Sequence, residues 1–197
     1  TQPVGATICP GTSTTLSVVA AGNGTITYQW RNNGTPITGA TASSYVATTA
    51  GTYTVIVTAD CGSVTSANAV VTLKVTTAIT TQPINSSFCT GASSTLSVVA
   101  TGTAVTYQWR KDTTDITGAT TATYTTNVVG NYSVVVKGDC GTVTSNTVMV
   151  TQKVATAITT QPKNGGVCPN GTYLLNVVAT GDSTLKYRSE EHTSELQ

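Results

Sequence analysis

The sequence predicts an all-β protein built from tandem antiparallel β-sandwiches, two of them complete and one truncated. Three observations support this fold class. First, 45 of the 197 residues are Thr and 25 are Val, and β-branched side chains fit a pleated sheet better than a helix. Second, apolar and polar residues alternate over short runs that Gly, Asn and Asp separate. Third, the same pattern returns about every 80 residues, which is enough chain for one small sandwich.

Short motifs define the repeat, and each returns after 79 or 80 residues. Thr-Gln-Pro stands at 1–3, 81–83 and 160–162, and Tyr-Gln-Trp-Arg stands at 28–31 and 107–110. We therefore expect one domain at 1–77, a second at 78–156 and the truncated start of a third at 157–187.

Each strand of the second copy is predicted from its own alternation, in chain order. Apolar residues alternate with others at 96–100, 105–110, 132–136 and 148–150, which is typical of half-buried strands. The last strand is expected to run over 148–154 and the first strand of the next copy over 156–162, with Pro83 and Pro162 on an edge strand. No Gly/Ser-rich linker intervenes, so we expect a stiff rod, the alternative being a flexible string of beads.

The last ten residues, 188–197, differ from the rest in composition. They hold all three Glu and the only His, which is His192. The third copy keeps the repeat pattern as far as Tyr187, and Arg188 then stands where the Gln-Trp pair should follow. The string resembles the in-frame translation of a DNA-sequencing adapter. We therefore predict a non-native tail and exclude it from the functional argument, so that the chain is expected to be a segment of a longer protein.

The repeat resembles an immunoglobulin-like domain. The run at 95–98 resembles the B strand of that family, and Gly-x-Tyr-x-Val at 51–55 and 130–134 resembles its tyrosine corner. The resemblance implies structural roles for a core tryptophan and a corner tyrosine in each copy, namely Trp30, Trp109, Tyr53 and Tyr132. The cysteines that link the two sheets of antibody domains are replaced by valines, which are Val18, Val55, Val98 and Val134.

The complete pattern, from CxG through TLSVVA, TYQWR, GxYxVxV and CG to TTQP, resembles the tandem immunoglobulin-like repeats of large secreted or surface proteins of Bacteroidota-type bacteria. This resemblance implies a bacterial source, an extracellular or cell-surface location, and neighbouring immunoglobulin-like domains of the same chain as partners. Five cysteines in a Thr-rich chain also favour an oxidising compartment.

Two disulfide pairings are open for the five cysteines, for which we expect structural roles: Cys9, Cys61, Cys89, Cys140 and Cys168. One pairing joins Cys9 to Cys61 and Cys89 to Cys140, within each domain. In an immunoglobulin-like sandwich, however, the A–B and F–G turns that carry these residues lie at opposite ends, about 23 Å apart, whereas a disulfide needs Cα atoms within about 7 Å. We therefore favour Cys9–Cys140 across the first junction, with the other three cysteines pairing with domains outside this chain.

No catalytic, cofactor-binding or metal-binding residue is expected. Residues 1–187 contain five Asp but no Glu or His, and there is no CxxC pair. Asp60 and Asp139 are predicted to hydrogen-bond their own F–G turns. A net charge of +1 gives no field for nucleic acid, and no run approaches the length of a membrane span. One sheet face, with Thr106, Gln108 and Arg110, is a candidate surface for glycans or proteins, although a plain solvent face is the usual explanation.

These observations lead to a non-enzymatic hypothesis. The chain is expected to be a structural repeat segment of an extracellular or cell-surface protein, acting as a stalk or spacer in adhesion. The alternative is an accessory, carbohydrate-binding segment of a secreted polysaccharide-degrading enzyme.

Overall fold

The computed structural model describes residues 1–190 and contains strands and no helix in that range. Among these residues there is therefore no helix that is long and apolar enough to cross a membrane. The predicted tail lies mostly outside the described residues, since only 188–190 of it are described. The strands of the first unit are β1 (Ala6–Ile8), β2 (Thr14–Ser17), β3 (Thr27–Asn32), β4 (Thr35–Pro36), β5 (Ser44–Ala47), β6 (Gly51–Ala59), β7 (Gly62–Thr65) and β8 (Ala69–Leu73).

The second unit repeats this order one period later. Its strands are β9 (Ala78–Thr81), β10 (Ser86–Cys89), β11 (Ser94–Ser97), β12 (Val99–Thr101), β13 (Thr106–Lys111), β14 (Thr114–Asp115), β15 (Thr123–Thr126), β16 (Gly130–Gly138), β17 (Gly141–Thr144) and β18 (Val148–Lys153). The third-unit segment, residues 157–190, contains β19 (Ala157–Thr160) and β20 (Val178–Thr180).

Each complete unit is a sandwich of two sheets. The larger sheet has the order β1-β8-β6-β3-β4 in the first unit and β10-β18-β16-β13-β14 in the second. The opposite layer contains the pairs β2–β5 and β11–β15. This two-layer arrangement is that of an immunoglobulin-like sandwich, which confirms the predicted fold class.

The pairing departs from the prediction at the first strand of each unit. β1 runs parallel to β8, and β10 runs parallel to β18, although we expected antiparallel strands throughout. β9, in contrast, pairs with β12, so the first strand of the second unit crosses from one layer to the other. Pro83 lies at this crossing, between β9 and β10 and not within an edge strand as predicted. A residue without an N–H group is tolerated there because no ladder bond is needed.

The core of each unit lies between its two sheets, where one tryptophan is central. Trp30 and Trp109 are fully buried, and Val55 and Val134 are buried beside them. Apolar packing therefore occupies the place where antibody domains have an inter-sheet disulfide. Each indole N–H donates a hydrogen bond to a backbone carbonyl, that of Ala42 or Thr121, at 3.0 Å, which satisfies the only polar group of the ring.

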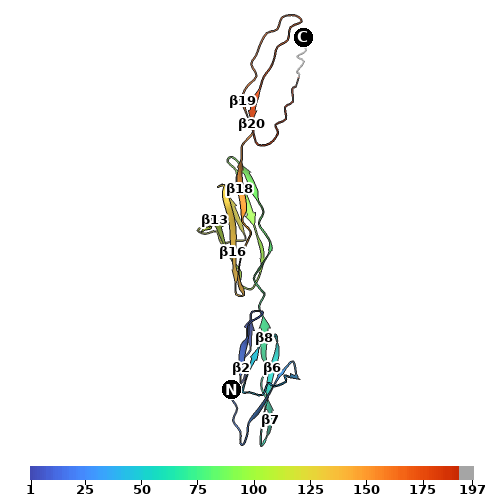
Figure 1. Cartoon of the computed structure of the whole chain (residues 1–197), viewed down its shortest axis with the longest axis vertical. Helices are drawn as coiled ribbons and strands as arrows, with labels where there is room; N and C mark the ends of the chain where they lie inside the picture. Colours follow the sequence, from blue (N-terminus) through green and yellow to red (C-terminus); the bar gives the residue numbers. More distant parts are fainter. Residues whose placement is uncertain (191–197) are drawn as a thin grey trace, which may run out of the picture.

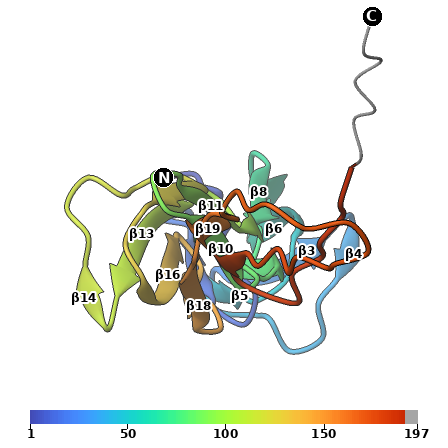
Figure 2. The same cartoon turned by 90° about the horizontal axis from the view of Figure 1, so that it is seen from above.

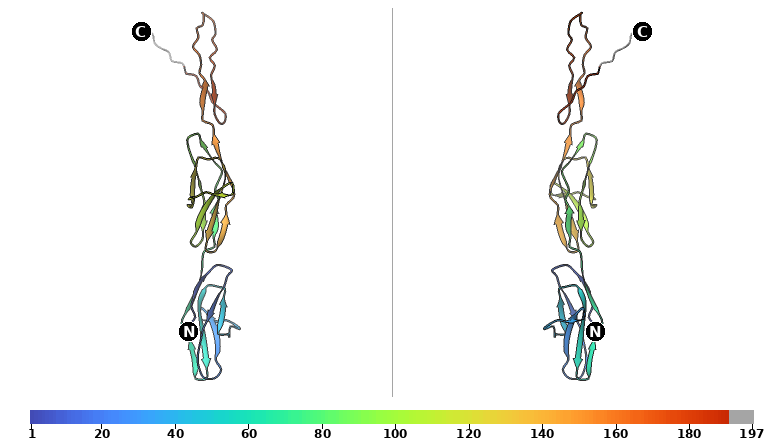
Figure 3. Two further views of the ribbon diagram at one scale, coloured as in Figure 1. Left: turned by 90° about the vertical axis from the view of Figure 1, so that its left-hand side faces the viewer. Right: turned by 90° about the vertical axis from the view of Figure 1, so that its right-hand side faces the viewer.

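The units are arranged end to end. Figures 1 and 3 show a long column with the first unit at one end, the second in the middle and the third-unit segment at the other end. Seen along the long axis, the two sandwiches overlap near the centre, while β14 of the second unit and β4 of the first project to opposite sides (Figure 2). The C-terminal end of the first sandwich therefore meets the N-terminal end of the second, which makes the junction between them the place to look for a functional site.

Candidate functional site: the junction between the first two units

Cys9 is held at the C-terminal end of the first unit, directly after β1. The N–H and the hydroxyl of Thr12 both donate to the Cys9 carbonyl, at 3.0 and 2.7 Å. Gly11 in this turn has a φ of 80°, a left-handed conformation that glycine adopts without strain. The turn therefore fixes the backbone of Cys9 where the chain leaves the sheet.

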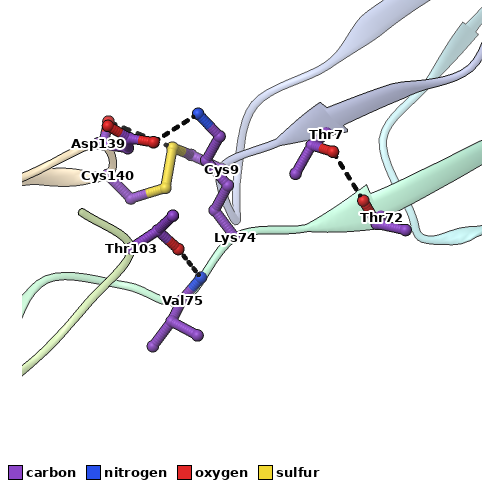
Figure 4. A network of polar contacts seen from close by, with 8 residues as sticks. All are labelled: Thr7, Cys9, Thr72, Lys74, Val75, Thr103, Asp139 and Cys140. Atoms are coloured by element: carbon purple, nitrogen blue, oxygen red, sulfur yellow. Dashed lines mark hydrogen bonds and ion pairs between the residues drawn. A yellow bond between two sulfur atoms is a disulfide. The ribbon is translucent and has the colours of Figure 1, made fainter.

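Cys140 is held at the N-terminal end of the second unit, in the two-residue turn Asp139-Cys140 between β16 and β17. Gly138 pairs with Gly141 across the base of this turn, and Gly141 has a φ of 125°. The Asp139 N–H donates to the carbonyl of Thr103 at 3.0 Å. The turn is thus tied to the neighbouring loop, and Cys140 projects toward the first unit (Figure 4).

The two cysteines form a disulfide across the junction, with Cα atoms 5.4 Å apart. This confirms the inter-domain pairing that the turn positions favour, and the intradomain pairing of Cys9 with Cys61 is wrong for this structure. The pairing follows from the direction of the strands. β1 carries Cys9 toward the junction, whereas β6 carries Cys61 to the far end of the same unit.

Beside the disulfide lie an ion pair and a hydrogen bond between Val75 and the Thr103 hydroxyl (Figure 4). Lys74, the first residue after β8, places Nζ 2.8 Å from Oδ2 of Asp139. The Val75 N–H donates to the hydroxyl of Thr103 at 3.0 Å, and the Thr103 N–H donates to the Val75 carbonyl at 3.3 Å. Asp139 was predicted to serve its own turn, and its carboxylate instead binds across the junction.

The linker itself is short and closely packed. Only residues 74–77 separate β8 from β9, and Thr77 is buried. A Cβ atom on Gly138 would lie 2.5 Å from the Thr77 hydroxyl and 3.0 Å from the Thr103 carbonyl. Sequence reasoning missed the role of Gly138. The available signal was a difference between the repeats, because the equivalent residue of the first unit is Ala59. The absence of a side chain at Gly138 lets the second unit approach the linker.

The other three cysteines are exposed and unpaired in the described part of the chain. Cys61 lies at the free end of the first unit, in the turn equivalent to that of Cys140. There the Asp60 N–H donates to the Asn23 carbonyl, which repeats the Asp139–Thr103 bond. Cys89 ends β10 and is equivalent to Cys9. Cys168 lies in the third-unit segment.

The predicted corner tyrosines are buried and hydrogen-bonded in the same way in both units. The Tyr53 hydroxyl donates to the Thr49 carbonyl and the Tyr132 hydroxyl to the Val128 carbonyl, each at 2.9 Å. Both hydroxyls thereby fix the loop that enters the longest strand of the unit. These contacts support a structural role for the two residues.

Sequence reasoning missed the structural role of three kinds of residue that hold the repeat together. Gln2 and Gln82 accept hydrogen bonds from backbone N–H groups beyond β7 and β17. Ser66 lies between β7 and β8, and Ser145 lies between β17 and β18. Each hydroxyl accepts a hydrogen bond from a backbone N–H of the long strand and donates one to the carbonyl of the next residue. Gln108 of the candidate ligand face donates to the carbonyls of Trp109 and Ile116. The only available signal was that these polar residues recur with the repeat.

Lys111 and Asp112 interact in the β13–β14 turn, far from the junction. A hydrogen bond from the Lys111 ammonium, together with the Asn131 N–H, lowers the pKa of the Asp112 carboxyl below its ordinary value. The same contact raises the pKa of Lys111. Asp112 and its equivalent Asn33 both have a left-handed backbone and accept from a strand N–H. Asp112 is therefore a turn residue.

The described residues contain no cluster of His, Cys, Asp and Glu able to hold a metal ion. A hollow of about 560 Å³ lies over the third-unit segment, where Ile158, Leu175 and Leu185 are among its lining residues. Leu175 is exposed in this hollow, whereas its equivalent Leu96 is buried between the two sheets of the second unit. At the junction, by contrast, a disulfide, an ion pair and hydrogen bonds join the two units.

No family model matches the chain, and no curated protein matches it in sequence. Solved structures do resemble it. A three-domain structure of titin domains I67–I69 with Glu-to-Ala changes has a TM-score of 0.66 and 16% identity over 82% of this chain and 67% of the titin chain. The I-band fragment I67–I69 of titin has a TM-score of 0.62 and 15% identity over the same shares. At this level of identity the similarity shows the fold, which is a tandem of immunoglobulin-like sandwiches.

Proposed function

We propose that this chain is a stiff, non-catalytic spacer segment of an extracellular or cell-surface protein. The observation that carries the proposal is the Cys9–Cys140 disulfide, which connects two successive sandwiches by a second covalent link. Two bodies joined by one flexible segment rotate freely, whereas two bodies joined at two points do not. A spacer needs this property if it is to hold a terminal domain at a fixed distance.

Residues on different strands cooperate to restrict the junction. The disulfide joins the β1 and β16 ends, the Lys74–Asp139 pair joins the β8 and β16 ends, and Thr103 holds the linker itself. The linker has no Gly or Ser among residues 74–77, so it lacks the composition of a flexible coil. Bending at this junction would break several of these contacts at once.

The proposed location follows from the redox chemistry of the joint. Disulfides persist in oxidising compartments and are rare where thiols are kept reduced. Together with the repeat pattern that resembles surface proteins of Bacteroidota-type bacteria, this supports placement outside the cell and a role as a stalk in adhesion.

The partners we propose are further immunoglobulin-like units of the same protein. The free end of the first unit repeats the surface that the second unit presents at the junction. It carries Asp60 and Cys61, and a hollow of about 340 Å³ lies beside Cys61. An upstream unit of the same type would place a cysteine and a lysine here, in the positions that Cys9 and Lys74 occupy at the junction.

Small-angle X-ray scattering on the oxidised chain tests the spacer proposal. Two sandwiches at roughly 40 Å each, estimated from strand lengths, predict a rod-like distance distribution with two separated maxima. Reduction with dithiothreitol cuts the only disulfide of the described residues and leaves both cores intact, so the second maximum should broaden. A broad distribution in the oxidised protein, with its disulfide verified by non-reducing digestion, would contradict the proposal.

A further inference from the structure

The disulfide gives the chain a second covalent route from one end to the other. Along the backbone, the distance from Cys9 to Cys140 is 131 residues. Through the sulfur atoms, the same two residues are neighbours. Residues 10–139 therefore lie inside a closed loop, and this loop contains β2–β16, which is most of both sandwiches.

The short route consists of strands that already run along the long axis. Residues 1–9 include β1 and lead toward the junction, and residues 140–156 include β17 and β18 and lead away from it (Figure 1). These are about 26 residues, and at about 3.3–3.6 Å each they span about 90 Å when extended. Two sandwiches of roughly 40 Å each have nearly the same length. The short route therefore has almost no slack.

We propose that the Cys9–Cys140 disulfide is the load-bearing bond of this segment. Tension applied to the two ends passes through residues 1–9, the disulfide and residues 140–156, and bypasses β2–β16. The inference rests on the proposed spacer function and adds a mechanical property to it. The disulfide-bonded tandem is inextensible even when a sandwich loses its native structure, because the closed loop limits the separation of its ends.

The position of the cysteines within each unit supports this role. An intradomain bond such as Cys9–Cys61 would leave the linker as the only connection between units, so the linker would carry the full load. The observed bond instead places the whole linker, residues 74–77, inside the loop, where it carries none. The residues that remain in the load path lie against sheet neighbours, since β1 is paired with β8 and β17 with β16.

Single-molecule pulling on the full chain, with handles at both termini, tests the inference. In the Cys9→Ser/Cys140→Ser variant each sandwich should unfold in a step of about 230 Å, because about 77 residues extend to about 270 Å from a folded length of roughly 40 Å. The oxidised wild-type chain should show no such step. Residues 157–197 lie outside the loop and should extend equally in both proteins.

Two further samples complete the experiment. The Cys61→Ser/Cys89→Ser variant keeps the Cys9–Cys140 bond and should behave as the wild type. Wild-type chain treated with dithiothreitol should show both steps, since the reagent closes to its cyclic disulfide as Cys9 and Cys140 gain two electrons and two protons.

The outcomes separate this inference from the spacer proposal. Steps of about 230 Å in the oxidised chain, with the disulfide verified by digestion, would overturn the load-bearing role while a rod-like scattering profile left the spacer intact. Absence of the disulfide from the oxidised protein would overturn the inference as well. A flexible scattering profile together with missing steps would instead refute the spacer and keep the load-bearing bond.

Discussion

The two junctions of the chain share a backbone arrangement and differ in what closes them. At the first junction the Thr103 N–H donates to the Val75 carbonyl at 3.3 Å, and at the second the Asp182 N–H donates to the Val154 carbonyl at 3.4 Å. The strand pair β9–β12 likewise returns as β19–β20. Only the first junction has a disulfide and an ion pair among residues 1–190.

This difference shows that the joint is made in two parts. The backbone contacts need only the first strands of the downstream unit, which both junctions have. The disulfide and the ion pair need its F–G turn, which lies about 60 residues further along the chain and which the third-unit segment does not reach. The covalent part of the joint thus requires a completed downstream sandwich.

The largest expected loss of stability comes from removing the disulfide, which leaves the first junction with noncovalent contacts only, as at the second junction. In the Cys9→Ser/Cys140→Ser variant we expect the free energy of unfolding to fall by about 4–5 kcal/mol, because a closed loop of this length restricts the unfolded chain. Chemical denaturation of both proteins under non-reducing conditions measures the loss. The Cys61→Ser/Cys89→Ser variant controls for loss of thiols and should match the wild type.

The next effect compares a complete core with an incomplete one. Leu96 in β11 is 2% exposed, whereas its equivalent Leu175 in the third-unit segment is 66% exposed. Leu96→Ala should therefore lower the free energy of unfolding by about 2–4 kcal/mol, since it leaves a cavity beside Trp109. Leu175→Ala should change it by less than about 0.5 kcal/mol. Equal losses in the two variants would show that the third-unit segment is packed in solution.

Much of the fold was predictable from local pattern. Period-two alternation located the strands around Trp109 and Tyr132, and the resemblance of the recurring Gly-x-Tyr motif to a tyrosine corner implied a structural role for Tyr132. The disulfide was predictable in a different way, because the positions of the two turns at opposite ends of a sandwich favour the inter-domain pair over the intradomain pair. Such an argument needs the fold class but no contact information.

What sequence reasoning missed depends on contacts between distant residues. The parallel pairing of β1 with β8 and the hydrogen bond from the Asn146 N–H to the Gln82 side-chain oxygen both join residues more than 60 positions apart. The Lys74–Asp139 pair spans 65 residues. The argument that placed Cys140 at the junction could also have predicted this ion pair. Lys74 follows the last strand of the first unit and Asp139 directly precedes Cys140, so both residues are expected at the junction. Asp139 was assigned to its turn by residue type alone.

A smaller effect tests the side-chain contact that Thr103 adds at the first junction to the backbone hydrogen bond that both junctions share. Thr103→Val removes the hydroxyl that accepts from the Val75 N–H and keeps the shape of the side chain. We expect a loss of about 1 kcal/mol in the free energy of unfolding, and faster hydrogen exchange at the Val75 amide. Thr103→Ser keeps the hydroxyl and should behave as the wild type. Unchanged exchange in Thr103→Val would mean that the hydroxyl does not hold the linker.

The smallest effect belongs to the ion pair that distinguishes the junctions. Lys74→Met removes the partner of Asp139 at a partly exposed site, and we expect a loss of about 0.2–1 kcal/mol. The loss should shrink in 1 M salt, where the screening length falls to about 3 Å. Lys153, the last residue of β18, is the equivalent of Lys74 and has no ion pair among the residues that the structure describes. Lys153→Met should therefore leave stability unchanged at any salt concentration, and a salt-dependent loss there would show that the second junction has an acidic partner of its own.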